Sequence, residues 1–199
     1  MKTIYIYFSM LLVIFISKAC CYGPPAIEKT IDNGILEDSV KIYLPYKDSS
    51  KVSFLDTNNV KLDYNIKRYL QPGIMFPSKC KFCCKGTLYT YKWQEDNISL
   101  TYKKDSSEFR FLTINIANRE KNCIDFYGSN LNYFVKVDSL NFLKKLDNVI
   151  INSKSYNNVF KLKPRYSNDT SEYLLFNKEF GVLKINYKNG KSFSLLSID

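Results

Sequence analysis

Short runs in which aromatic or β-branched residues alternate with polar residues follow one another from Val40 to the end of this chain. Successive side chains of a strand point to opposite faces, so such alternation indicates strands with one buried face and one solvated face. The sequence therefore predicts a mainly β fold with little helix. The predicted strands are Val40–Leu44, Lys51–Leu55, Val60–Ile66, Thr87–Trp93, Ile98–Lys103, Phe109–Ile116, Tyr133–Val137, Val149–Asn152, Val159–Lys163, Tyr173–Phe176, Val182–Tyr187 and Ser192–Leu196.

The connections between these runs predict antiparallel pairing. Gln94–Asn97 and Asp105–Ser107 are far shorter than the crossover that a parallel pair needs. Asn189 and Gly190 lie between two runs and accept the positive φ angles of a type I′ hairpin turn. Asp138–Asp147 is interpreted either as a short helix, with leucines behind a capping residue, or as an irregular edge. We expect an antiparallel meander that buries its apolar face by closing into a sandwich or a partly open β-barrel.

The first residues have the composition of a secretory signal peptide. Lys2 precedes an apolar run, Ile4–Ile16, that is too short for an ordinary membrane span, and the small residues Ser17 and Ala19 follow it. We expect cleavage after Ala19, with an uncleaved anchor as the less favoured alternative. The predicted organisation is a signal peptide at 1–19, a tether at 20–35 and a single β-rich domain at 36–199.

Cleavage after Ala19 would make Cys20 the first residue of the exported chain. Bacterial lipoproteins carry their lipid anchor on a cysteine in this position, and such an anchor would tether the protein to a membrane. Ser17 and Lys18 depart from the residues that usually precede such a cysteine. A lipid anchor at Cys20 and a plain secreted chain therefore both remain open. The expected location is the bacterial cell envelope, in the outer membrane or periplasm, or the medium.

Cys80, Cys83 and Cys84 form a compact cluster, and Cys123 is their distant companion. An exported chain reaches an oxidising compartment, so we favour two disulfides among these four cysteines, with the connectivity left open. A redox CxxC motif is less favoured because such motifs open a helix, whereas Leu88–Trp93 reads as a strand. A structural zinc site of four thiolates is also less favoured, because it would require a second CxxC. We predict no metal.

The composition excludes several kinds of chemistry. The chain contains no histidine, which removes the commonest general base and the commonest transition-metal ligand. Its net charge is +10, but the lysines are scattered rather than clustered, so we predict no nucleic-acid binding. No cofactor motif and no catalytic set stands out. Most of its acids lie in polar stretches that we interpret as solvated turns; examples are Glu95, Asp96, Glu108, Glu120 and Asp125.

The C-terminal third carries the run Ser155–Leu162, with Tyr156, Asn158 and Val159 in a YxNV arrangement, followed by Leu175–Lys184. This pattern resembles that of small exported β-rich proteins and lipoproteins of Bacteroidota, in which a YxNV strand precedes a GxxKF strand. The Lys, Asn, Ile and Tyr-rich composition is also similar to theirs. These proteins have no assigned activity. The resemblance therefore implies export and a β architecture, and it transfers no functional residue.

Three functions are compatible with these features. We favour a non-enzymatic envelope or surface protein that acts by binding or scaffolding, with a protein, a glycan or an apolar ligand as its partner. The first alternative is a carrier that encloses a lipid or another apolar ligand in a curled sheet. The second is a carboxylate-dependent glycan hydrolase, which needs two acids about 5 to 10 Å apart in a cleft.

Overall fold

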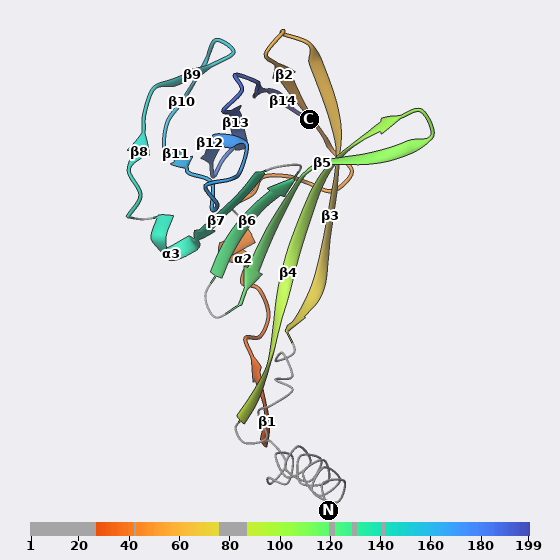
Figure 1. The fold of residues 1–199 in the computed structure, drawn as a ribbon, viewed down its shortest axis with the longest axis vertical. Helices are drawn as coiled ribbons and strands as arrows, with labels where there is room; N and C mark the ends of the chain where they lie inside the picture. The colour runs from red at the N-terminus through yellow and green to blue at the C-terminus, as the bar shows by residue number, and fades with distance from the viewer. Residues whose placement is uncertain (1–26, 42, 76–86, 120–121, 129–130, 141) are drawn as a thin grey trace, which may run out of the picture. The chain divides into compact units, whose positions relative to one another are not determined.

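The computed structural model describes residues 27–41, 43–75, 87–119, 122–128, 131–140 and 142–199 (Figure 1). The chain divides into two compact units, Met1–Asp32 with Ile74–Lys92, and Asn33–Gly73 with Trp93–Asp199. In the first unit, strand β1 (Ile27–Asp32) runs parallel to residues Thr87–Lys92 of strand β4. The rest of the predicted tether before β1 lies outside the described residues.

The sheet confirms the prediction of a mainly β, antiparallel meander with little helix. Its 12 strands are ordered β7-β6-β5-β4-β3-β2-β14-β13-β12-β11-β8, with β1 beside β4. Apart from the β1–β4 pair, the strand pairs whose register lies within the described residues are antiparallel. The strands of this path are β2 (Lys51–Asp56), β3 (Lys61–Met75), β4 (Thr87–Lys104), β5 (Ser107–Asn118), β6 (Asn122–Gly128), β7 (Leu131–Lys136), β8 (Lys145–Leu146), β11 (Val159–Leu162), β12 (Ser171–Asn177), β13 (Gly181–Tyr187) and β14 (Ser192–Ile198).

Small elements complete the described chain. Strands β9 (Val149–Ile151) and β10 (Lys154–Tyr156) form a separate hairpin. The short helices are α2 (Asp38–Lys41) and α3 (Val137–Leu140). In the part of the chain that the structure describes, no helix has the length and apolar character needed to cross a membrane.

Several predicted boundaries are wrong. Val40–Leu44 is not a strand, because Val40 belongs to α2 and Leu44 lies in the loop that follows, although both side chains are buried. The predicted connector Gln94–Asn97 lies inside the continuous strand β4. Its consecutive polar side chains point alternately to the two faces of β4, with Glu95 and Asn97 on one face and Asp96, which is paired with Arg68, on the other. Strand β6 was not predicted.

The last hairpin forms where it was predicted, but with a different turn. Only Gly190 has a positive φ, of 82°, whereas a type I′ turn needs positive φ at Asn189 as well. The N–H of Gly190 donates to the carbonyl of Tyr187, and the N–H of Tyr187 donates to the carbonyl of Lys191. This arrangement is a three-residue loop closed by a glycine in the left-handed region.

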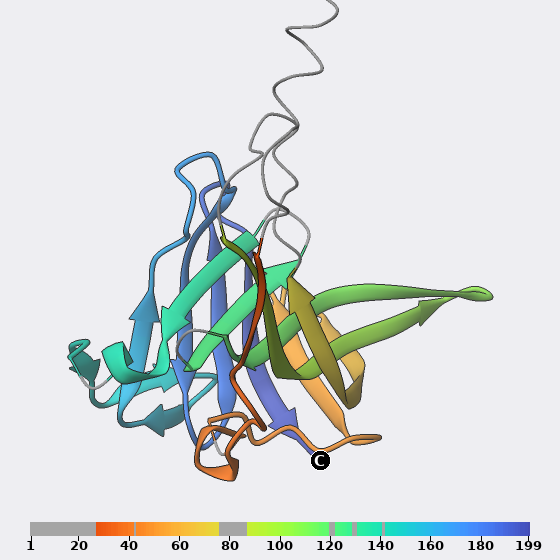
Figure 2. The same ribbon diagram turned by 90° about the horizontal axis from the view of Figure 1, so that it is seen from below.

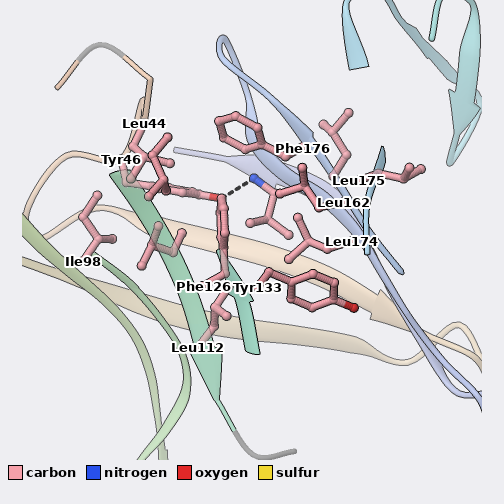
Figure 3. Packing of buried hydrophobic residues seen from close by; sticks show 14 of the residues in the cluster. Leu44, Tyr46, Ile98, Leu112, Phe126, Tyr133, Leu162, Leu174, Leu175 and Phe176 are labelled. Carbon is pink, nitrogen blue, oxygen red and sulfur yellow. Dashed lines mark hydrogen bonds between the residues drawn. The ribbon is translucent and has the colours of Figure 1, made fainter. Parts of the chain in front are cut away.

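The apolar core lies between strands from the two ends of the sheet (Figures 1 and 2). The ring of Phe126 on β6 lies 5.4 Å from that of Phe176 on β12, and Phe111 on β5 lies 5.0 Å from Phe193 on β14. Figure 3 shows side chains of β6 and β7 directed toward those of β12. Burial of rings from both sides removes apolar surface from water and holds the curled sheet together.

Tyr46 joins the loop after α2 to this core. Its side chain is fully buried, and its Oη accepts a hydrogen bond of 2.8 Å from the backbone N–H of Val182 on β13 (Figure 3). Gly181, the preceding residue, has a φ of 70°, and a Cβ there would lie 2.5 Å from the Tyr46 hydroxyl. The tyrosine ring therefore occupies space that only a glycine leaves open.

Candidate functional site

The cysteines singled out in the sequence lie mostly outside the described residues. This holds for Cys20 and for the cluster Cys80, Cys83 and Cys84. Cys123 lies on β6, is buried and carries a free thiol, which donates to the carbonyl of Ala117 at 3.5 Å. Burial raises the pKa of this thiol to about 11. Lipidation and the two disulfides therefore stay predictions.

The interpretation of the acids as solvated turn residues is wrong for three of them. Glu95 and Asp96 lie within β4 and Asp125 within β6, and all three are buried. Glu108 lies on β5 and is partly exposed, and Glu120 is outside the described residues.

Asp96 has a structural partner. Arg68 on β3 donates to both of its carboxylate oxygens, from Nε at 3.1 and 3.0 Å and from Nη2 at 2.5 Å. The Nη1 of Arg68 also donates to the backbone carbonyl of Tyr46 at 2.6 Å. This ion pair fastens the loop after α2 to the sheet, and it takes no part in the site described next.

A continuous polar layer covers the opposite side of β4, β5 and β6 from the core. The pairing register places Asn97, Asn115 and Asp125 in one row across the strands, with Ser99 and Thr113 in the next row. Exposed fractions in this layer range from 2% to 9%. We call this layer the polar face; it consists of Glu95, Asn97, Ser99, Thr113, Asn115 and Asp125.

Glu95 is the most heavily hydrogen-bonded carboxylate of the polar face. Its Oε1 accepts from Trp93 Nε1 at 2.6 Å, and its Oε2 accepts from Gln71 Nε2 at 3.1 Å and from Asn115 Nδ2 at 3.0 Å. Burial alone would raise the pKa of Glu95, but these hydrogen bonds and the charge of Arg119 outweigh it. The pKa therefore lies below its ordinary value.

Asp125 lies in a contrasting environment on the same face. Burial raises the pKa of Asp125, and the charges of Arg119 and Arg165 offset this only in part. Arg119 lies between the two carboxylates, with Nη2 3.6 Å from Glu95 Oε1 and Nη1 3.4 Å from Asp125 Oδ2. Its guanidinium also lies 5.6 Å from the centre of the Trp93 ring. The two acids are thus held together with pKa values displaced in opposite directions.

Much of the hydrogen-bonding capacity of the polar face is unused. Buried polar groups in folded proteins are almost always hydrogen-bonded, and an unpartnered group costs about 1–3 kcal/mol. On the polar face and the adjoining Arg119, the buried atoms without a hydrogen-bond partner in the structure are Asn97 Nδ2, Ser99 Oγ, Thr113 Oγ1, Asn115 Oδ1, Arg119 Nε and Asp125 Oδ2, the last of which has only its ion pair.

Aromatic side chains border the polar face. Tyr127 stands in the row of Ser99 and Thr113, and Phe134 stands in the row of Asp125; both rings are 37% exposed. Burial raises the pKa of Tyr127, and the charge of Glu95 raises it further, while the charge of Arg110 lowers it in part. The register places Phe134 directly opposite Asp125 and Tyr127 in the neighbouring row of the same face.

The described chain also has open grooves away from the polar face. One, of about 580 Å³, is lined by residues of β10 and β14 with Phe180; another, of about 630 Å³, lies beside Asn157 and Lys178. The described residues contain no group of His, Cys, Asp and Glu that could hold a metal ion.

The sequence carries one signal for the polar face. Alternation of Asn97 and Ser99 with Ile98 and Leu100 marks a two-sided strand, but it is equally typical of a strand that faces water. Comparison with known proteins adds no family: no protein-family model, no curated protein and no solved structure matches this chain.

Proposed function

We propose that this chain is an exported, non-enzymatic protein of the cell envelope or surface, and that it acts by binding a partner through the polar face. A membrane anchor at Cys20 or release into the medium is compatible with this function. The observation that carries the proposal is the group of buried, unpartnered polar atoms on the polar face. Their partners would come from a bound ligand.

Stability alone does not account for such a layer. Replacing polar groups that have no partner by apolar groups of similar shape is neutral or stabilising. Selection for stability alone would therefore not retain unpartnered polar groups. The hydroxyls of Ser99 and Thr113, together with one unpartnered amide atom each of Asn97 and Asn115, form a local conflict between sequence and fold. Such conflicts are concentrated at functional sites.

The packed interior of the sheet disfavours a ligand between its two ends. We infer a sandwich-like closure, because the rings of Phe111 and Phe126 pack directly on Phe193 and Phe176. The largest fully buried side chains include Tyr46, Tyr133, Phe54, Phe126, Phe160 and Phe176. A carrier of an apolar ligand would instead need that space for its cargo.

The test uses Trp93 as a built-in reporter. It is the only tryptophan of the chain and donates to Glu95, so a ligand on the polar face should change its fluorescence. Probes of several classes should be titrated: neutral oligosaccharides, polygalacturonate, synthetic peptides and phospholipid vesicles. We expect saturable binding by one class, weakened at least tenfold in Ser99→Ala and unchanged in Ser194→Ala on β14. No saturable response from any class, or equal effects of both variants, would reject the proposal.

A second candidate, the carboxylate-dependent glycan hydrolase, is favoured by one observation: Glu95 and Asp125 share Arg119 and have oppositely displaced pKa values. Such a divergence distinguishes the general base from the general acid in a carboxylate pair. Protonated Asp125 would give its proton to the leaving oxygen as the glycosidic bond breaks, while Glu95 takes a proton from the water that attacks the sugar carbon.

The hydrolase candidate has its own test. Release of reducing ends from neutral polysaccharides by the wild-type protein, lost in both Glu95→Gln and Asp125→Asn, would favour it over simple binding. Binding without any release of reducing ends would leave the non-enzymatic function as the better account.

A further inference from the structure

We propose that the ligand of the polar face is an uncharged glycan, bound through its hydroxyl groups. This inference rests on the proposed function, because it names the chemical class that the same surface would recognise. The charge, the hydrogen-bonding capacity and the aromatic border of the polar face each favour that class.

The charges of the polar face are balanced before any ligand arrives. Arg119 lies within 4 Å of both Glu95 and Asp125, and the charge of Arg165 also acts on Asp125. A cationic ligand would have to displace Arg119 from between the carboxylates, and an anionic ligand would face the two acids themselves. Burying a charge without a partner is costly, so the ligand that fits carries no charge.

The unpartnered atoms include both donors and acceptors. Asn97 Nδ2 and Arg119 Nε can only donate, Asn115 Oδ1 can only accept, and the hydroxyls of Ser99 and Thr113 can do both. Each hydroxyl of a sugar is itself one donor and two acceptor lone pairs. A surface with interspersed donors and acceptors is therefore matched by a polyhydroxylated molecule, whereas a lipid chain would leave every one of these groups unpaired.

The backbone of the polar face disfavours a peptide. Strands β4, β5 and β6 are internal to the sheet and paired on both sides, so their N–H and C=O groups are already used. An extended peptide usually gains its affinity by adding a strand to an open edge. A ligand of the polar face must therefore be bound by side chains, as the hydroxyl groups of a glycan can be.

Aromatic rings complete the match. The faces of a sugar ring that carry C–H groups are apolar and pack against aromatic rings, while its edges carry the hydroxyls. Tyr69 and Tyr127 are 46% and 37% exposed, and both lie near the polar layer, with Tyr127 in the row of Ser99 and Thr113. Partly exposed side chains change rotamer readily. Rotation of Tyr127 would open the row that contains Ser99 and Thr113.

The test measures binding of maltohexaose, cellohexaose, xylohexaose and chitohexaose by isothermal titration calorimetry with the full exported chain. The informative variant is Tyr127→Ala, and its matched control is Tyr102→Ala, whose ring is also 37% exposed but contacts Tyr64 and Phe109 away from the polar face. Circular dichroism checks that both variants remain folded. We expect at least one of the four glycans to bind, at least tenfold more weakly in Tyr127→Ala and within twofold of wild type in Tyr102→Ala.

The outcomes separate this inference from the proposed function. If a peptide or a vesicle, and none of the glycans, changes Trp93 fluorescence in a manner that Ser99→Ala weakens, the glycan inference is overturned and the proposed function stands. If a glycan binds but Tyr127→Ala and Tyr102→Ala weaken it equally, the polar face is not its site and both proposals fall. If Tyr127→Ala unfolds, Thr113→Val replaces it with the same expected loss of affinity.

Discussion

Replacing Tyr46 with phenylalanine isolates one hydrogen bond that fastens the loop after α2 to β13. The ring would keep its place against Gly181, so no cavity forms and the change is confined to the hydroxyl. The N–H of Val182, a fully buried residue, would lose its acceptor. A buried donor left without a partner costs about 1–3 kcal/mol, which is the expected loss in the free energy of unfolding for Tyr46→Phe.

The matched control is Tyr133→Phe. Tyr133 is as fully buried as Tyr46, but its hydroxyl lies near only the side chain of Ser171, and no backbone N–H donates to it. Removing it should leave the free energy of unfolding within about 0.5 kcal/mol of wild type or raise it. Urea unfolding followed by circular dichroism measures both changes; with a slope of about 1–3 kcal/mol per M, the midpoint of Tyr46→Phe should fall by on the order of 1 M. Equal losses in the two variants would refute the reasoning.

Two further predictions concern the buried acids. Asp96→Ala should lower the free energy of unfolding by about 3–5 kcal/mol, because it leaves the guanidinium of Arg68 partly buried without its carboxylate, and chemical denaturation measures the loss. Asp125→Asn should remove a pH dependence, because the raised pKa of Asp125 favours its protonated form in the folded state. The free energy of unfolding of the wild type relative to this variant should therefore be greatest below the ordinary aspartate pKa of about 3.9. It should fall as pH rises through the raised pKa. Thermal unfolding of both proteins from acid to neutral pH measures that difference, and a difference that grows with pH would contradict the assignment.

The sequence was sufficient to predict the fold class and most of the strands, because alternation with a period of two is read directly from the chain. It failed at Gln94–Asn97, where a polar run belongs to the interior of β4. Polarity predicts a turn only when the polar side chains face water, and that depends on which strands pack beside them. The predicted turn type at Asn189 was wrong for a related reason, because the loop length is set by the pairing of Tyr187 with Lys191.

The candidate site was harder to predict than the fold. Asp125 lies on a strand that the sequence did not reveal, and its proximity to Glu95 depends on the register between β4, β5 and β6. A shift of one residue in that register would move every polar side chain to the other face. The charges of Glu95 and Asp125 are visible in the sequence, but the guanidinium that joins them is placed only by the fold.

The most direct test of the central claim needs no ligand. If the polar face is maintained for a partner, removing an unpartnered hydroxyl from it should not weaken the fold. We predict that Thr113→Val keeps or raises the free energy of unfolding, whereas Thr101→Val, which removes a 2.9 Å hydrogen bond to Glu108, lowers it by about 0.5–1.5 kcal/mol. A loss in Thr113→Val as large as that in Thr101→Val would show that the Thr113 hydroxyl serves the fold, and it would contradict a polar face held ready for a ligand.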